Sequence, residues 1–452
     1  MDNISKTIDP KIRLIVTVLL LFSGFVSLAS QTMMITALPV IEHEMNVSLT
    51  LVQWLTTGYT LMVGVITPLS SNLYEKFKKR NIFLATIAIF ILGTLIGCFA
   101  TDFWLLLLAR LVQACASGIL MSFQMTTMIS IYPIEKRGTI LGMSGLVIAF
   151  GPAIGPTLSG LIVNTLGWRY IFILVLPMML LVWSIGFFAF PNFSEPKDIK
   201  IDFISVGLSL LGSGLTLASL TFFQTSALQG WIMLVLGLAI LFIFVKRQLR
   251  LKQPMLKVQL VKNRSFRLMT LVGICAFMVL LGTEQMLPIF TQNVLHLNSM
   301  VSGMILLPGA IANALSAALV GRLYDKHGPK YLIISGGILM LIAAIPFVMI
   351  SETTPVWLLT VAYMLRMIGN ALVFSPAMSE AFVDVLPDEV SHATALNNSL
   401  RQAFGASSIT ILIVLSNIPA TFTAGMRLSM WVTVGLVLLM LTCFGLYLRK
   451  DA

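Results

Sequence analysis

The sequence predicts an all-α polytopic membrane protein with fourteen transmembrane helices, arranged as two pseudo-symmetric six-helix bundles with two extra helices between them. Hydrophobic residues make up 58% of the 452 residues and charged residues 10%, which excludes a soluble globule of this length. Fourteen apolar runs approach the roughly 20 residues that a bilayer crossing requires. A charged ten-residue segment occurs twice, which indicates that the two bundles are related to each other.

The first bundle, residues 1–190, contains six predicted helices, at about 14–40, 50–70, 82–101, 103–127, 139–163 and 169–190. The central segment, residues 191–267, contains two more, at about 203–224 and 230–245, followed by a basic loop. The second bundle, residues 268–452, contains the last six, at about 268–291, 301–321, 331–350, 356–378, 394–416 and 427–448. Because the number of crossings is even, both termini are expected on the same side of the membrane.

The repeated charged segment reads SNLYEKFKKR at Ser71–Arg80 and GRLYDKHGPK at Gly321–Lys330, an offset of 250 residues. Each copy alone is explained as a basic hairpin between two membrane helices. The pair is typical of a duplicated membrane protein whose halves move against each other. We expect Glu75, Asp325 and Arg322 to gate the side that bears the termini, the two acids by pairing with basic groups or a helix amino end.

The positive charges predict the orientation. Of the 29 Lys and Arg residues, all but five fall on the side that bears both termini, so this side is expected to be cytoplasmic. This distribution accounts for most of the net charge of +11 without a nucleic-acid partner. The loop at 246–267 carries eight basic residues and no acid; it either binds anionic lipid headgroups or simply anchors the topology. Six of the seven tryptophans fall near predicted outer helix ends, as in an interfacial aromatic belt.

Several ordered motifs resemble the major facilitator superfamily, and more narrowly its fourteen-helix drug:proton antiporters. Besides the two charged segments, they are RLVQ at Arg110–Gln113, GPAIGP at Gly151–Pro156, GWRYIF at Gly167–Phe172, QWLTTGY at Gln53–Tyr59, LPIFTQ at Leu287–Gln292, LLPG at Leu306–Gly309 and LRQAFG at Leu400–Gly405. The resemblance covers nearly the whole chain and implies the major facilitator fold and proton-coupled drug export. One departure is Ser30, which stands where members often carry an acid in the first helix.

The resemblance also implies roles for residues of the helices at 103–127 and 139–163. The family associates the arginine at position 110 with proton transfer, and Arg366 is its symmetry mate in the second bundle. Because a guanidinium does not deprotonate, Arg110 would act on a partner carboxylate or hold a hydrogen-bonded network with Gln113. A buried structural ion pair is the alternative.

The glycine-rich helix at 139–163 is expected to pack closely against a neighbour and to bend where the bundles meet. Its gating residues are Gly151, Pro152, Gly155 and Pro156, which form the family's export motif. Ordinary small-residue helix packing is the alternative interpretation.

Glu284 is the one acid that the sequence places deep inside a predicted helix. A charge in mid-membrane is costly, so such a residue is a functional candidate. We expect Glu284 to take up a proton, which burial favours, and to bind a cationic drug when ionised. The alternative is that it only hydrogen-bonds a neighbouring helix. Gln31, Gln124 and Gln292 are the other candidates for substrate contact, and Arg401, nearer a helix end, is expected to snorkel toward water.

Together these features predict a proton-coupled multidrug efflux antiporter that exports hydrophobic, mainly cationic or zwitterionic drugs by alternating access. It would be a monomeric multi-pass protein of a bacterial cytoplasmic membrane with cytoplasmic termini, surrounded by membrane lipids. No glycine-rich nucleotide-binding loop or metal-ligand spacing is present, so the proton gradient is the expected energy source and no cofactor is expected. The alternatives are a narrow-substrate metabolite or lipid exporter and, less favoured, a membrane-embedded enzyme or a structural subunit.

Overall fold

The computed structural model describes residues 9–132, 151, 154–192, 202–223, 226–251, 254, 256–386 and 389–449, apart from the side chains at 71, 75, 129, 221, 318, 325, 390 and 391. Within these residues the chain forms helices and no strands, so the all-α prediction is confirmed. In the same residues, 13 helices are long and apolar enough to cross a membrane. Most of the predicted helix at 139–163 lies outside the described residues, which show a helix over 154–165.

The helices of the first bundle follow the predicted order. They are α2 (Pro10–Met45), α3 (Leu49–Val52), α4 (Trp54–Lys76), α5 (Lys79–Cys98), α6 (Phe103–Ile131), the segment 154–165 and α8 (Arg169–Ala189). Local signals set their starts: the Asp9 side chain accepts a hydrogen bond from the Lys11 amide before Pro10 begins α2, and Asp102 caps α6. Hydropathy therefore located these helices, and capping residues fix two of their starts.

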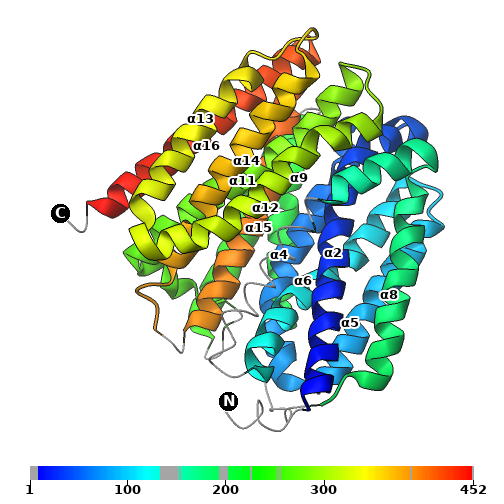
Figure 1. Ribbon diagram of the computed structural model, residues 1–452, viewed down its shortest axis with the longest axis vertical. Coiled ribbons are helices and arrows are strands. Elements are labelled where there is room, and N and C mark those ends of the chain that lie inside the picture. Colours follow the sequence, from blue (N-terminus) through cyan, green and yellow to red (C-terminus); the bar gives the residue numbers. More distant parts are fainter. Residues whose placement is uncertain are drawn as a thin grey trace.

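The remaining helices also match the predicted ones. The central pair is α9 (Phe203–Phe222) and α10 (Ala227–Arg250), followed by the short 3-10 helix η1 (Val258–Lys262). The second bundle contains α11 (Arg264–Asn293), α12 (Ser299–His327), α13 (Pro329–Val348), α14 (Val356–Ala381), α15 (Val390–Ser416) and α16 (Phe422–Leu448). Figure 1 shows the two bundles side by side with their axes inclined to each other. The division at residues 190 and 267 stays a prediction.

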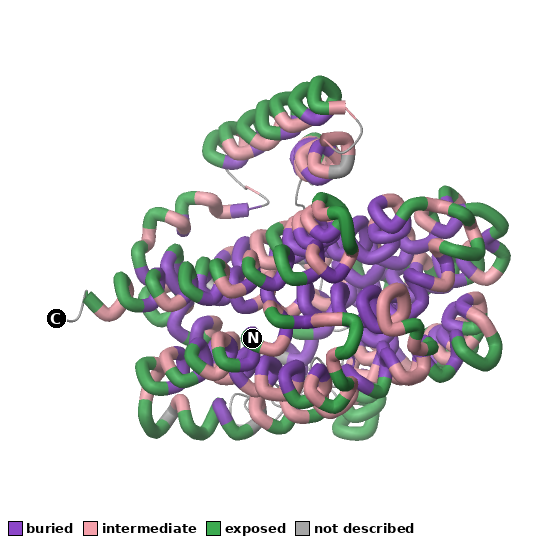
Figure 2. The backbone as a smooth tube through the Cα atoms, turned by 90° about the horizontal axis from the view of Figure 1, so that it is seen from above, coloured by how far each residue is buried: buried purple, intermediate pink, exposed green. Residues whose placement is uncertain are grey.

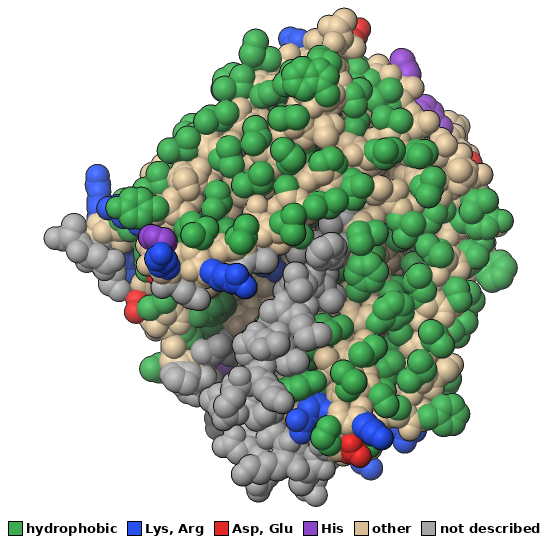
Figure 3. Space-filling view, viewed as in Figure 1, with side chains coloured by type: hydrophobic (Ala, Val, Ile, Leu, Met, Phe, Trp, Pro, Cys, Tyr) green, Lys and Arg blue, Asp and Glu red, His purple; other side chains and the backbone are tan. Residues whose placement is uncertain are grey.

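The helix ends define two opposite faces of the molecule. The terminus face is the side where α2 begins and α16 ends, and the far face is the side where α2 ends and α16 begins. In Figure 1 the ends of the two bundles diverge toward the terminus face. Figure 3 shows hydrophobic side chains over the flank and most of the visible Lys and Arg side chains toward the terminus face, as expected for a membrane-embedded protein.

The charged segments are mostly helical, which corrects the expectation of open turns. Helix α4 continues through Lys76, and α12 continues through His327. The chain then turns at Gly328, whose φ of 70° lies in the region that glycine tolerates best, and Pro329 begins α13. Nothing between Gly321 and Gly328 breaks a helix, so the polar residues there extend α12 beyond its apolar stretch.

The two copies of the charged segment also share a contact, because the tyrosine of each copy bonds to a residue at the corresponding position of its own bundle. The Tyr74 hydroxyl donates to the Ser130 hydroxyl at 3.4 Å, and 250 residues later the Tyr324 hydroxyl donates to the Glu380 carboxylate at 2.7 Å. The Tyr447 hydroxyl donates to the other Glu380 oxygen at 2.5 Å. The helix predicted at about 356–378 would end before Glu380, but Glu380 lies inside α14 and is 9% exposed. The two hydroxyls explain how it is held there.

The tryptophans only partly form a belt. Trp104, Trp231, Trp357 and Trp431 are exposed, as interfacial residues should be. Trp168 is buried instead, and its indole N–H donates to the Glu44 carboxylate at 2.8 Å.

The α9–α10 hairpin stands at the edge of the bundle, with α10 largely exposed (Figure 2). Leu217 of α9 packs against Leu61 of α4 and Ala406 of α15, so the hairpin spans a seam between the two bundles. Its ends are tied together by Arg247 of α10, which pairs with Asp202 at 2.9 Å. The hydrogen bond from Arg247 lowers the pKa of the Asp202 carboxyl below its usual range, so this tie persists into mildly acidic solution.

Candidate functional site

Glu284 lies on α11, which packs against helices of both bundles, and is 5% exposed. Among the residues that the structure describes, no side chain or backbone group forms a hydrogen bond or ion pair with its carboxylate. The neighbouring Thr283 bonds within its own helix, to the Val279 carbonyl at 2.8 Å. Gln285 is 1% exposed, and neither of its amide atoms has a partner within the described part of the chain. The described residues therefore show no hydrogen bond through which Glu284 would fasten α11 to a neighbouring helix, and its role stays a prediction.

Tyr363 connects Glu284 with Arg366. Its side chain is 2% exposed on α14 and interacts electrostatically with both groups. The antiparallel register of α11 and α14 explains this proximity. The Asn370 amide of α14 donates to the Ala276 carbonyl of α11 at 2.8 Å. Two helical turns from this contact, toward the far face, Tyr363 of α14 is level with Glu284 of α11. The structure thus gathers two of the three residues predicted for proton coupling around a tyrosine that the sequence analysis missed.

Arg366 is fully buried and only partly satisfied. One terminal nitrogen donates to the Thr433 hydroxyl of α16 at 2.5 Å, and the guanidinium carbon lies 5.6 Å from the Phe347 ring centre. Its Nε and Nη1 atoms have no partner in the described part of the chain. This arrangement leaves donors free for a group that enters or for a neighbour that moves.

Arg110, the symmetry mate of Arg366, sits instead in a complete network of neutral acceptors. It donates to the Leu55, Ser30 and Gln31 carbonyls at 3.2–3.3 Å and to the Gln113 amide oxygen at 2.9 Å. Gln113 in turn donates to Thr94 at 2.8 Å, and the guanidinium carbon lies 4.2 Å from the Tyr59 ring centre. The expected network with Gln113 is confirmed, and these contacts join α2, α4, α5 and α6.

Ser30 occupies the place where the resembling antiporters often carry an acid, and it touches Arg110 directly. Its hydroxyl lies 3.5 Å from Nη1 of Arg110, in addition to the contact through its carbonyl. A carboxylate at this position would pair with the arginine. Serine leaves Arg110 with neutral partners, and Glu284 lies in the other bundle.

The three glutamines are not gathered into one place by any described contact. Gln31 donates to Thr60 at 3.4 Å within the first bundle, and Gln124 packs its amide against Gly24. Gln292 lies between the bundles, where it donates to the Thr36 carbonyl at 3.1 Å. Their role in substrate contact stays a prediction.

The glycine-rich segment packs closely against its neighbours, as predicted. A Cβ added to Gly151 would lie 2.9 Å from the Leu28 Cβ, and one on Gly155 would lie 2.9 Å from the Ala29 carbonyl oxygen. The Pro156 carbonyl accepts a hydrogen bond from Thr36 at 3.3 Å. Of the remaining gating residues, Arg322 is exposed on α12, whereas Pro152 and the side chains of Glu75 and Asp325 lie outside the described residues. Gating by all of these residues stays a prediction.

Direct hydrogen bonds between the bundles concentrate toward the far face. Thr157 donates to the Gly303 carbonyl at 3.0 Å, Ser299 to the Gly160 carbonyl at 3.2 Å, and Gln292 to the Thr36 carbonyl. In mid-membrane, Ser399 of α15 donates to the Gly64 carbonyl of α4 at 2.8 Å. Among the described residues no such bond lies nearer the terminus face. The structure is therefore closed toward the far face.

We expect Gly303→Leu to hold this closed end apart. A Cβ at position 303 would lie 2.6 Å from the Pro156 carbonyl oxygen, and overpacking of this kind costs about 1–3 kcal/mol, so the ratio of closed to open molecules should fall about fivefold or more. The measurement is alkylation of Ser299→Cys, in a chain whose four native cysteines are replaced by serine, by a maleimide that does not cross membranes.

The matched control is Gly435→Leu, because a Cβ at Gly435 of α16 meets nothing within 4 Å. Alkylation should rise in Gly303→Leu and stay unchanged in the control. Equal alkylation in the two variants would show that contact at Gly303 does not maintain the closure.

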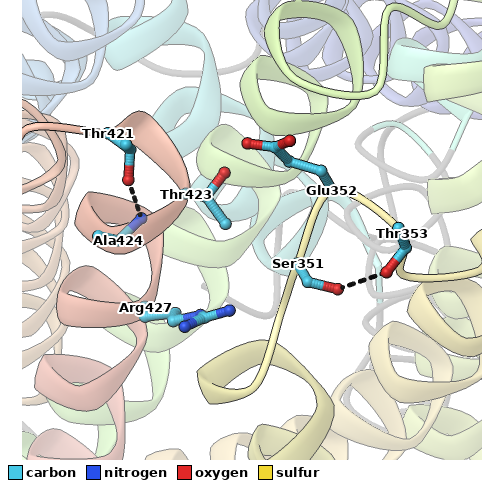
Figure 4. Close-up of a pocket in the computed structure, with 7 residues that line it drawn as sticks. All are labelled: Ser351, Glu352, Thr353, Thr421, Thr423, Ala424 and Arg427. Atoms are coloured by element: carbon cyan, nitrogen blue, oxygen red, sulfur yellow. Dashed lines mark hydrogen bonds between the residues drawn. The ribbon is translucent and has the colours of Figure 1, made fainter.

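A shallow hollow of about 330 Å³ opens on the far face of the second bundle (Figure 4). Its lining residues come from the α13–α14 loop and the start of α16: Ser351, Glu352, Thr353, Thr421, Thr423, Ala424 and Arg427. None of the predicted site residues lines it. The candidate site is therefore the buried group around Glu284 rather than this hollow.

Comparison with known proteins identifies the family of this chain. Residues 20–410 match the family model described as Major Facilitator Superfamily. An uncharacterized MFS-type transporter of Bacillus subtilis, YcnB, is 37% identical over 92% of this chain and 89% of its own length. The lincomycin resistance protein LmrB of the same organism is 35% identical over 87% of this chain and 83% of its own length. The riboflavin transporter RibZ of Clostridioides difficile is 23% identical over 96% and 98%.

Proposed function

The chain belongs to the major facilitator superfamily, and the relatives named above are transporters. We propose that it is a proton-coupled exporter of hydrophobic drugs. The observation that carries the proposal is the buried carboxylate of Glu284, which has no partner among the described residues. The similarity to lincomycin resistance proteins supports a drug as the cargo. An enzyme or a structural subunit is not proposed, since the family and its named members are transporters.

The mechanism follows from one carboxylate with two ligands. When protonated, Glu284 is neutral and stable in a buried position; when ionised, it attracts a cationic substrate, since a lone charge there is costly. Proton and substrate therefore compete for the same group. This competition couples the two fluxes, provided that the site opens to one face at a time.

Tyr363 and the arginines support this exchange. Tyr363 lies within electrostatic reach of both Glu284 and Arg366, so a change of charge on Glu284 would be felt by the tyrosine that lies near both groups. Arg110 holds α2, α4 and α6 together through its neutral network and does not itself exchange protons.

We further propose a bacterial cell membrane as the location, with the terminus face in the cytoplasm, because basic residues concentrate on that face. The closed far face would then correspond to an inward-facing state. One proton exchanged for one monovalent cation moves no net charge, so such a cycle draws on the pH gradient, about 1.4 kcal/mol per unit. A zwitterionic substrate would add the membrane voltage, about 2.3 kcal/mol per 100 mV.

A second candidate is a narrow-substrate exporter of the same superfamily. The similarity to a riboflavin transporter over nearly the whole chain favours it, although the identity is 23%. The two candidates differ in breadth of substrate rather than in mechanism.

The test uses inverted membrane vesicles from cells that produce the protein, energised to an acid interior. We expect ethidium to enter these vesicles and protons to leave with it, and structurally unrelated cations to compete with ethidium. Vesicles from cells with the empty vector give the background. If one compound alone moves protons, the narrow-substrate candidate holds; if no compound does, proton-coupled export is contradicted.

A further inference from the structure

Its position on α15 led us to expect Arg401 to snorkel toward water at the terminus face, but it does not. Its guanidinium carbon lies 4.9 Å from the ring centre of Phe277 on α11 and 4.9 Å from that of Phe374 on α14. The two ring centres are 6.3 Å apart. The charged group therefore lies against two aromatic rings at the junction of three helices of the second bundle.

The donors of this guanidinium are largely unused. Nη1 contacts the Met378 sulfur at 3.9 Å, and Nε is buried without a partner in the described part of the chain. A guanidinium has five N–H donors, and a thioether is a weak acceptor. Arg110 shows the contrast within the same protein, since carbonyl and amide oxygens accept from its three nitrogens. Arg401 has the charge of Arg110 without its acceptors.

The group can also be reached from outside. Arg401, Phe277 and Phe374 are all partly exposed, whereas Arg110 and Arg366 are fully buried. A guanidinium binds a carboxylate or a phosphate through two parallel hydrogen bonds in its own plane. An oxyanion is therefore the acceptor that best matches the unused donors of Arg401.

The position of Arg401 relative to Glu284 indicates which molecule brings this oxyanion. Phe277 and Glu284 are seven residues apart on α11, hence on the same helix face and about 10 Å apart along it. The acidic side chain of Glu284 and the basic side chain of Arg401, which contacts Phe277, thus lie along the same face of α11, about two helical turns apart. A substrate that carries both an amine and an acid matches this spacing.

We propose that Arg401, supported by Phe277 and Phe374, binds the anionic group of amphoteric substrates, while Glu284 binds their cationic group. This inference rests on the proposed export function and adds to its simple cationic substrates a class of molecules with a carboxylate or phosphate near a planar apolar body. Anionic lipid headgroups offer the same oxyanion, so they are the competing source of the ligand.

The test uses two dyes that differ by a single ester: tetramethylrhodamine, which has a free carboxylate, and its methyl ester, which is a cation. Binding to the purified full-length protein in nanodiscs of phosphatidylcholine is measured by fluorescence anisotropy. In Arg401→Gln we expect the affinity for the acid to fall about tenfold or more, since a charge-assisted bidentate pair is lost, and the affinity for the ester to change by less than about twofold.

Two further variants keep the result interpretable. Arg401→Lys retains the charge without the planar fork and should lose part of the preference for the acid. Lys330→Gln removes an exposed positive charge at the start of α13 and should bind both dyes as the unmodified protein does. An equal loss for acid and ester in Arg401→Gln would indicate a structural role and overturn the proposal, as would no loss for either.

The source of the oxyanion is tested by repeating the titrations with phosphatidylglycerol in the nanodiscs. If the preference for the acid persists, the substrate supplies the group; if it disappears, lipid headgroups occupy Arg401 and the substrate assignment fails. Proton flux is measured separately. Arg401-dependent binding without proton flux would contradict the export function alone, and proton-coupled transport without the acid preference would contradict this inference alone.

Discussion

Glu284→Gln is expected to abolish proton-coupled substrate transport. Glutamine has nearly the same shape and does not titrate, so the variant should insert normally but lose the exchange between proton and substrate. Groups that transfer protons typically contribute about a hundredfold or more to a rate, and we expect a loss of at least that size. The measurement is substrate-driven proton release from proteoliposomes that contain purified protein, together with uptake of the substrate itself.

Two controls accompany this measurement. Glu284→Asp keeps a titratable carboxylate one methylene shorter and should retain measurable coupling. Glu352→Gln removes an acid from the shallow far-face hollow and should leave transport unchanged. If Glu284→Gln transports with normal proton coupling, the proton site lies elsewhere and the central assignment is wrong.

Arg110→Lys is expected to lower both transport and thermal stability strongly. Lysine cannot reproduce contacts to α2, α4 and Gln113 at once, and each hydrogen bond to a charged group is worth about 1.5–3 kcal/mol. Loss of two such bonds corresponds to about a hundredfold or more in any equilibrium that depends on the network. The measurements are the unfolding midpoint in detergent and the initial rate of substrate uptake.

Arg366→Lys is the matched comparison for this prediction. Arg366 makes one hydrogen bond in the described part of the chain, to Thr433, so its replacement should lower the unfolding midpoint much less. Equal stability losses in the two variants would show that the neutral network around Arg110 is not what holds the first bundle together.

Hydropathy predicted the helices because a membrane span must be apolar along its whole length. The ends were less accurate where polar residues continue a helix beyond that length, as at Lys76 and His327. Glu284 was recognised because it is the one acid that the sequence places deep inside a predicted helix, and its burial follows from its position on the central helix α11.

What the sequence did not reveal depends on pairs that are distant along the chain. Arg401 meets Phe277 from 124 positions away, and nothing local to α15 indicates that contact. The same holds for Ser30 and Arg110, where the sequence identified the departure from the family pattern but not the contact that gives it a consequence. Tyr363 was missed because a tyrosine in a transmembrane helix is not by itself a functional signal, and its neighbours Glu284 and Arg366 are known only from the structure.

The repeated tyrosine contact near the terminus face bears on how the two bundles tolerate mutation. One copy of the repeat has a pair of hydroxyls, Tyr74 and Ser130, and the other joins Tyr324 and Tyr447 to the Glu380 carboxylate. Replacing either hydroxyl of the first pair leaves no charge behind, whereas removing a tyrosine from the second strands a carboxylate. The first contact should therefore tolerate the loss of a hydroxyl more readily than the second, where a buried carboxylate stays behind with one donor fewer.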